Sequence, residues 1–402
     1  MKRIVFLIVI LVIVIGITGC WNRQELNEIA ITVAMGLDKR GNQYQVSVQI
    51  VNPSEVSAKK GSASKGTPVA TYSETGKTVS EALRKMVNKA PRVLYFSHLR
   101  LLVIGEGLAK EGIGEVLDYL SREYSFRTDF YLVISKGVPA ERILEVYTLP
   151  QEVIPANKIF RSLQNSSKLW GAATEITLDG VISDATKDGK QPVLSGISIT
   201  GAKESESIET KSNVEHVKPI GSLTFSGMAA FKKDKMLGWL NQQESRAYYY
   251  IEDKVDNTVE TVSCPDGGNI TIEILRSRSD IKGILTGGKP EIDVQLQVEG
   301  NLDEVQCDLN LTTEENLQRL EKITESHIQA NLEKTINSVK RQYKSDIFGF
   351  GEAIHRTLPR YWVDLKNNWN DHFVELPVHV SVDVKIRRIG TLTDSFVRRL
   401  KE

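Results

Sequence analysis

The chain has 402 residues, of which 41% are hydrophobic and 25% are charged, a composition typical of globular proteins. Lys and Arg together number 51 and Asp and Glu also number 51, so the formal net charge is zero. This balance gives no support to nucleic-acid binding, which requires a basic surface to neutralise phosphates, and it argues against a polybasic membrane contact. The length is sufficient for two or three domains.

The N-terminus is organised around Cys20. Two basic residues precede an apolar run at 4–17, and small residues stand directly before the cysteine. The run is shorter than the ~20 residues that a helix needs to cross a bilayer. We therefore predict that residues 1–19 are a signal peptide whose cleavage leaves Cys20 at the new N-terminus, outside a membrane. The alternative is an uncleaved helical anchor with an incidental cysteine.

Apart from Cys20, the chain contains Cys264 and Cys307. In an extracytoplasmic setting these two could form one disulfide. They could equally remain two thiols that behave as small hydrophobes. The sequence leaves both possibilities open, because it cannot place the two Cα atoms within bonding range of about 7 Å.

The first half of the chain predicts strands that alternate with helices. Apolar residues recur with a period of two at 29–37 and again at 44–50, which indicates a β-hairpin. Thr78 and Glu81 have the spacing of a capping box at the start of a helix. Residues 54–67 have the composition of a polar surface loop. The further elements are a buried strand at 99–104, a helix around 116–120, a strand at 130–134 and a short helix at 140–146.

Two prolines bracket a break at 150–157, and residues 157–186 predict helical pieces that could form a subdomain. A strand follows at 197–199. Residues 201–219 carry little apolar surface and predict a linker or a protruding hairpin.

The second half opens with an apolar hairpin at 228–240 that has a charged turn, followed by a helical segment. Alternating residues then predict strands at 270–274, 292–298 and 378–386. Between the last two lies one long helix, whose predicted capping box is Thr312 and Glu315. The overall prediction is an α+β, multidomain protein. An N-terminal mixed α/β sheet domain occupies 20–200, and a C-terminal antiparallel-sheet domain with one long helix occupies 220–402.

No catalytic, cofactor-binding or metal-binding residue is predicted. Thr71 stands where a Walker A loop needs its first glycine, and no histidine pair has the i, i+4 spacing of a helical zinc site. A catalytic pair of carboxylates could still assemble in space. We interpret Trp362 and Trp369, the tyrosines at 248–250, and His98 as residues of the core.

The segment at 20–28, CWNRQELNE, resembles the N-terminus of the Ger(x)C lipoproteins of spore germination, and residues 17–20 resemble a bacterial lipobox. The likeness continues over most of the chain through the segments VAMGLDK at 33–39, VQIVNP at 48–53, SH at 97–98, VIGEGLA at 103–109 and GMAAFKKDKMLGWL at 227–240. Asn22 departs from the aspartate that the family pattern leads us to expect.

This resemblance implies a non-enzymatic C subunit of a nutrient germinant receptor. Cys20 would carry a diacylglyceryl group that holds the protein on the outer face of the spore inner membrane. The implied partners are the integral A and B subunits, with a role in assembly or signal coupling. From the residues alone, a solute-binding lipoprotein feeding a transporter and a cell-wall-acting enzyme remain alternatives.

Overall fold

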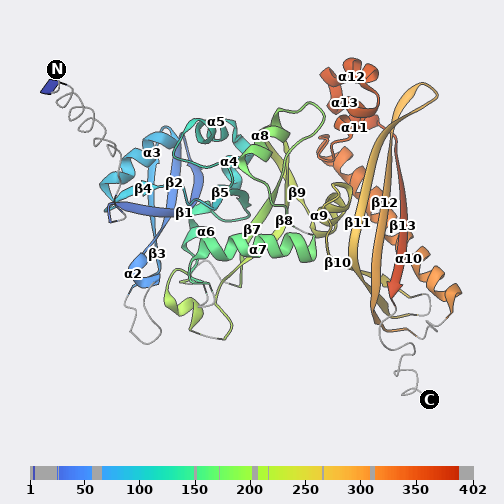
Figure 1. The fold of residues 1–402 in the computed structure, drawn as a ribbon, viewed down its shortest axis with the longest axis horizontal. Coiled ribbons are helices and arrows are strands. Elements are labelled where there is room, and N and C mark those ends of the chain that lie inside the picture. Colours follow the sequence, from blue (N-terminus) through green and yellow to red (C-terminus); the bar gives the residue numbers. More distant parts are fainter. Residues whose placement is uncertain are drawn as a thin grey trace.

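The computed structural model describes residues 3–4, 25, 27–56, 66–148, 152–171, 173–201, 207–215, 217–264, 267–307 and 313–388. Within these ranges the chain forms two sheets that lie side by side, with helices packed against each (Figure 1). The predicted α+β architecture, with an N-terminal mixed sheet and a C-terminal sheet crossed by a long helix, is confirmed. No helix among the described residues is long and apolar enough to cross a membrane.

The N-terminal sheet has nine strands in the order β3-β2-β1-β5-β6-β7-β8-β9, with β4 paired to β1. The four central strands β1, β5, β6 and β7 are parallel to one another, whereas the pairs β1–β2, β2–β3, β7–β8 and β8–β9 are antiparallel. The strands are β1 (Ile29–Arg40), β2 (Gln43–Val51), β3 (Val69–Gly76), β4 (Val93–Tyr95), β5 (Leu101–Gly105), β6 (Tyr131–Ser135), β7 (Val193–Thr200), β8 (Ser222–Lys232) and β9 (Lys235–Leu240). The predicted hairpin of β1 and β2 is confirmed, whereas sequence analysis missed β3.

Helices cover both faces of this sheet (Figure 1). One face packs against α3 (Val79–Lys85), α4 (Glu106–Glu111), α5 (Gly114–Arg122) and α8 (Leu178–Thr186). The other packs against α6 (Ala140–Glu145) and α7 (Pro155–Trp170). All five residues of β5 are consequently buried. The predicted cap of α3 is confirmed at Thr78, whose Oγ1 accepts a hydrogen bond of 3.1 Å from the Glu81 backbone N–H.

The N-terminal sheet continues after the connection at 201–219, because β8, which follows this connection, pairs antiparallel with β7. The connection contains the short helix η2 (Lys211–Val214). Asn213 fixes the part of this connection that leads into β8. Its side-chain amide donates to Tyr147 O at 2.8 Å, and its Oδ1 accepts from Gly221 N at 2.7 Å. The predicted hairpin of β8 and β9 is confirmed, with Lys233 in the left-handed region at φ 55°.

The C-terminal sheet has the order β10-β11-β12-β13. Its strands are β10 (Thr258–Ser263), β11 (Asn269–Thr286), β12 (Lys289–Val305) and β13 (Val378–Arg388). The first three pair antiparallel, but β13 is parallel to β12, so the prediction of a purely antiparallel sheet is wrong at its last strand. The cause is the long helical crossover between them, which returns the chain to the end where β12 began.

This crossover begins with α10 (Glu314–Gln342), which lies across the sheet (Figure 1). Its N-cap is Thr313, whose Oγ1 accepts from Asn316 N at 3.4 Å. The predicted cap was therefore one residue early, and Thr312 itself lies outside the described residues. The crossover continues through α11 (Phe350–Thr357), α12 (Pro359–Leu365), η3 (Lys366–Asn368) and α13 (Trp369–Glu375). The remaining helices are α2 (Pro53–Val56), η1 (Met86–Asn88) and α9 (Gln242–Ile251).

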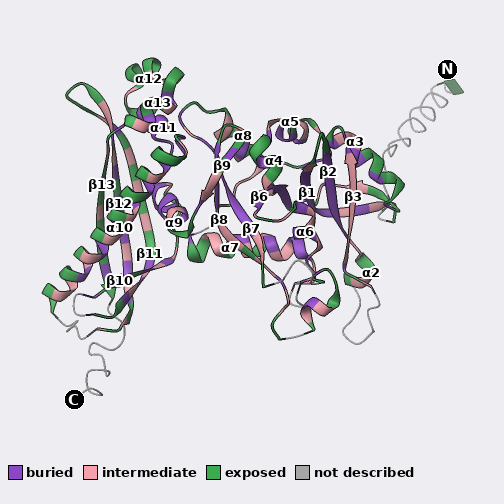
Figure 2. Ribbon diagram, turned by 180° about the vertical axis from the view of Figure 1, so that it is seen from behind, coloured by how far each residue is buried: buried purple, intermediate pink, exposed green. Residues whose placement is uncertain are grey.

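The aromatic residues singled out in the sequence are buried as predicted. The three tyrosines of α9, at 248–250, and Trp362 and Trp369 are all 4% exposed or less. The core prediction for His98 is wrong. His98 is exposed, on a surface turn before β5, with its ring 5.9 Å from that of Tyr95. In Figure 2 the central strands of the N-terminal sheet are mostly buried, whereas the edge strand β3 is mostly of intermediate exposure.

Candidate functional site

The predicted lipidation site, Cys20, lies outside the described residues, so its modification stays a prediction. Within the described part of the chain, no three His, Cys, Asp or Glu side chains gather in a way that could hold a metal ion. The polar features that the fold does bring together are a disulfide, a buried junction between the two sheets, and two cavities.

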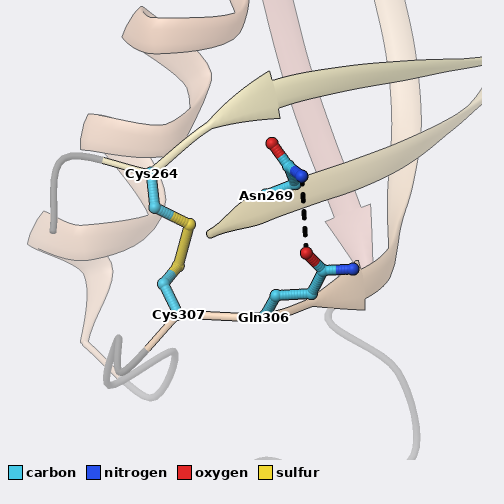
Figure 3. Close-up of a disulfide and its surroundings, with 4 residues drawn as sticks. All are labelled: Cys264, Asn269, Gln306 and Cys307. Atoms are coloured by element: carbon cyan, nitrogen blue, oxygen red, sulfur yellow. Dashed lines mark hydrogen bonds between the residues drawn. A yellow bond between two sulfur atoms is a disulfide. The ribbon is translucent and has the colours of Figure 1, made fainter. Parts of the chain in front are cut away.

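Cys264 and Cys307 form a disulfide with a Cα–Cα distance of 6.3 Å (Figure 3). Cys264 directly follows β10, and Cys307 lies just beyond the end of β12. The bond therefore joins two strand ends that flank the start of β11. Beside it, Gln306 N donates to Asn269 O at 2.9 Å. A structural disulfide agrees with the predicted extracytoplasmic location.

The junction between the sheets is formed by the loop that follows α10. Tyr343 donates its hydroxyl to Trp239 O at 2.9 Å, and Ser345 donates to Phe231 O at 2.8 Å. Asp346 O accepts from Gln191 N at 2.8 Å. All three acceptor or donor partners belong to the N-terminal sheet or the residues just before β7. Two hydrogen bonds from side-chain hydroxyls and one between backbone groups thus hold this loop against the N-terminal sheet.

The Asp346 side chain is fully buried in this junction. Its Oδ2 accepts from Gly351 N at 2.8 Å and from Trp369 Nε1 at 2.9 Å, and its Oδ1 accepts from Phe348 N at 3.1 Å. Burial disfavours the carboxylate and raises the pKa of Asp346 to about 6, although these hydrogen bonds oppose the shift. Through these hydrogen bonds the Asp346 side chain connects the loop to α11 and α13.

A buried ion pair crosses the same junction. Lys190, just before β7, donates to the Glu252 carboxylate at the end of α9. Burial is the largest single influence and lowers the pKa of Lys190, but the charges of Glu252, Asp184 and Asp346 and the hydrogen bond to Glu252 together exceed it, so the pKa is raised. Residues of β7, β8 and β9 also belong to the hydrophobic core of the C-terminal sheet. The two sheets are therefore joined by a continuous core as well as by polar contacts.

One cavity, of about 190 Å³, lies where α7 ends beside α9, β10 and α10. Its most polar residue is Glu260 on β10, which is only 5% exposed. Glu260 Oε1 accepts from Arg246 Nη2 at 2.6 Å and from the Tyr250 hydroxyl at 3.0 Å. Burial and the Glu260 charge raise the pKa of Tyr250 well above its ordinary value, so Tyr250 remains a donor. The second cavity, of about 230 Å³, lies between β3 and the segment after α6.

The tyrosines at 248–250 lie in the core, as the sequence predicts. The cavity around Glu260, which Tyr250 helps to form, was not predicted. Trp170, Arg246, Glu260 and His327 come from four different elements. No fixed spacing connects them, so no sequence motif could have revealed the cluster. Glu260 shares the buried face of β10 with Thr258 and Val262, so the short strand does not reveal the buried carboxylate by its pattern.

Two family models match the chain. The model described as "Spore germination protein N-terminal domain" matches residues 22–199, and "Spore germination B3/ GerAC like, C-terminal" matches residues 226–390. Spore germination protein KC of Bacillus subtilis (strain 168) is 31% identical over 412 residues, which cover 100% of this chain and 99% of that protein. The chain belongs to the Ger(x)C family of spore germination proteins.

Membership of the Ger(x)C family confirms the resemblance drawn from the sequence. Spore germination protein B3 of the same strain is 24% identical, with 94% of this chain and 96% of that protein covered. The crystal structure of the GerBC protein superposes with a TM-score of 0.56 at 20% identity, covering 88% of this chain and 96% of that one. At this identity the structural likeness shows a shared fold.

Proposed function

We propose that this Ger(x)C protein is the lipid-anchored subunit of a spore nutrient germinant receptor. In this role it would assemble with, or couple signals between, the integral A and B subunits. The observation that carries the proposal is the similarity to Spore germination protein KC, which extends over the whole of both chains. The family models, one for each half, support the same assignment. The matched models and relatives are named as germination proteins, and we propose a role without catalysis.

The proposed anchor is a diacylglyceryl group on Cys20, on the outer face of the spore inner membrane. Support comes from the basic start, the apolar run at 4–17 and the small residues before the cysteine. Each buried acyl methylene contributes ~0.8 kcal/mol, and two chains hold a protein stably where one holds it only marginally. Anchoring also raises the effective concentration of the subunit near membrane partners.

The geometry favours this function over a solute-binding lipoprotein. A solute-binding protein of that type would need a concave site between two lobes, with polar groups converging on it. Here the junction loop, the Asp346 network and a shared hydrophobic core lie between the two sheets. The cavity around Glu260, at the end of α7, has a volume of about 190 Å³, smaller than the roughly 300–1,000 Å³ of typical ligand sites. Because the two sheets share one core, we expect them to move together. A movement of the anchored N-terminal half would then also move the surface that contacts a partner on the C-terminal half.

The test is a crosslinked pull-down from dormant-spore membranes, comparing wild type, Cys20→Ala and the control Asn22→Asp. We expect wild type and Asn22→Asp to recover two polytopic proteins, and Cys20→Ala to recover less or none. Asn22 is a suitable control because it neighbours the cysteine without accepting lipid. Recovery of a transporter ATPase, or of no membrane protein, would instead favour the solute-binding reading.

A further inference from the structure

We propose that the cavity around Glu260 binds a small organic cation, a primary ammonium group on a short apolar body. The cavity is lined by side chains from α7, α9, β10 and α10, so it exists only in the folded chain. Its polar side is formed by Trp170, Arg246, Tyr250, Glu260, His327 and Asn331. This proposal does not depend on the receptor assignment.

Glu260 supplies the anionic acceptor. Within the described part of the chain, its two donors, Arg246 Nη2 and the Tyr250 hydroxyl, both bond to Oε1. Among the described residues, Oε2 accepts no hydrogen bond, and His327 Nε2 lies 3.9 Å from it, beyond hydrogen-bond range. Since a buried carboxylate has capacity for several donors, Oε2 is the atom that remains able to accept from an occupant.

Arg246 is already engaged and does not compete for the open oxygen. Its Nη2 donates to Glu260 Oε1 and to the backbone carbonyl of Val259, and its guanidinium lies 5.3 Å from the centre of the Trp170 ring. Arg246 Nε is enclosed and makes no hydrogen bond among the described residues, so it is out of reach of an occupant. The guanidinium thus fixes the carboxylate while leaving Oε2 on the cavity side.

The neighbouring polar groups add acceptors. His327 Nε2 lies 3.0 Å from Asn331 Nδ2, a geometry in which the ring nitrogen accepts and the amide oxygen is left free. His327 Nε2 has a single lone pair, which this contact occupies, so Glu260 Oε2 and the Asn331 amide oxygen are the acceptors that these side chains leave for an occupant. A primary ammonium has three donors and no acceptor, which matches this set. Hydrogen bonds to an ionised partner are about twice as strong as neutral ones, which favours the cation over an alcohol.

The lining of the cavity also includes apolar residues that can pack against the body of the occupant. They are Ala247, Val259, Ile328 and Leu332. The cavity volume of about 190 Å³ is that of roughly six waters at about 30 Å³ each. This is room for an ammonium group with a chain of about four carbons. We therefore choose n-butylammonium as the probe.

The test is calorimetric titration of the full chain in detergent micelles with n-butylammonium, 1-butanol and butyrate. We expect saturable binding of n-butylammonium, at least tenfold weaker binding of 1-butanol, and no binding of butyrate. Glu260→Gln should weaken n-butylammonium binding at least tenfold. Ala247→Leu should also weaken n-butylammonium binding at least tenfold, because the larger side chain fills the cavity. This variant leaves Glu260 and Arg246 intact, so it tests the proposal even if Glu260→Gln fails to fold.

The matched control is Glu291→Gln. Glu291 also faces a histidine, His379 Nε2, at 2.8 Å, but it lies on the outer side of the C-terminal sheet and lines neither cavity. This variant should bind n-butylammonium as wild type does. Equal affinity in wild type and Ala247→Leu, equal affinity for 1-butanol and n-butylammonium, or no saturable binding by wild type would each overturn the proposal.

Discussion

The two sheets of this protein are built on opposite plans. The N-terminal sheet is covered by helices on both faces, so its central strands, such as β5, are buried throughout. The C-terminal sheet is covered on one face by α10 and α11, and β12 and β13 alternate between buried and more exposed residues. The two sheets therefore differ in how much of their surface is packed against helices. The N-terminal sheet is packed on both faces, whereas the C-terminal sheet has one packed face and one face that is exposed to solvent.

The solvent-exposed face of the C-terminal sheet carries ion pairs between neighbouring strands. Glu299 on β12 lies between Arg276 on β11 and Arg387 on β13, at 2.7 and 2.8 Å. Hydrogen bonds from Arg387, and then from Arg276, hold the pKa of Glu299 down at about 2. Because these groups are exposed, solvent screens the interaction, and we expect it to align strands more than to stabilise them.

The largest effect should come from the doubly covered sheet. Leu102 on β5 is fully buried, and helices on both sides leave little freedom for a cavity to collapse. Leu102→Ala should lower the free energy of unfolding by about 2–5 kcal/mol, more than Leu296→Ala on β12. The exposed control Leu285→Ala should have almost no effect. Urea unfolding, with hydrogen exchange resolved by strand, measures all three; an equal loss at Leu102 and Leu296 would contradict the comparison.

The disulfide should stabilise only the C-terminal sheet. It spans 43 residues, and bonds closing loops of this size contribute typically about 2–4 kcal/mol. The double variant Cys264→Ala/Cys307→Ala should lose this stability and the exchange protection of β10, while β5 stays protected. Wild type treated with a reductant should behave like the variant. Loss of protection in β5 as well would show that the two sheets unfold together.

Asp346 should give the junction a pH dependence. Its native pKa of about 6, against an ordinary value of 3.8, means that the folded protein holds this proton more tightly than the unfolded chain. The resulting stability, up to about 3 kcal/mol, is fully present below the ordinary pKa and is lost as the pH rises through about 6.

Asp346→Asn provides the measurement. An amide cannot accept all three hydrogen bonds, so the variant should be less stable than wild type at low pH. As the pH rises from 4 to 7, the gap in unfolding free energy should narrow, because wild type alone loses stability from this group. A gap that stays constant with pH would show that Asp346 keeps one protonation state over this range.

The smallest effects should come from the helix caps, one in each half. Thr78 caps α3 of the N-terminal sheet, and Thr313 caps α10 of the C-terminal one. Replacing either by Ala should cost about 1 kcal/mol. In the long α10 we expect the loss to appear as faster amide exchange in the first turn only. An effect on Tm several times larger for Thr313→Ala would show that the helix start is coupled to the sheet.

Several parts of the fold could be predicted because their signals are local. Period-two alternation marks the strands at 29–37 and 378–386, and the hydroxyl–carboxylate spacing of Thr78 and Glu81 marks a helix start. Such patterns record which side of an element meets water. β3 was missed because each of its residues before the last, Gly76, is only partly buried, which leaves no alternation to detect.

The sequence by itself predicted most of the elements and the resemblance to the family, and the anchor at Cys20 stays a prediction. Only the tertiary structure decided that β8 and β9 complete the N-terminal sheet, that β13 runs parallel to β12, and that the two later cysteines pair. The Glu260 cavity likewise appears only when four elements meet. The reason is physical: periodicity and capping depend on neighbours along the chain, whereas strand order, pairing and cavities depend on groups that loops and crossovers bring together from far apart.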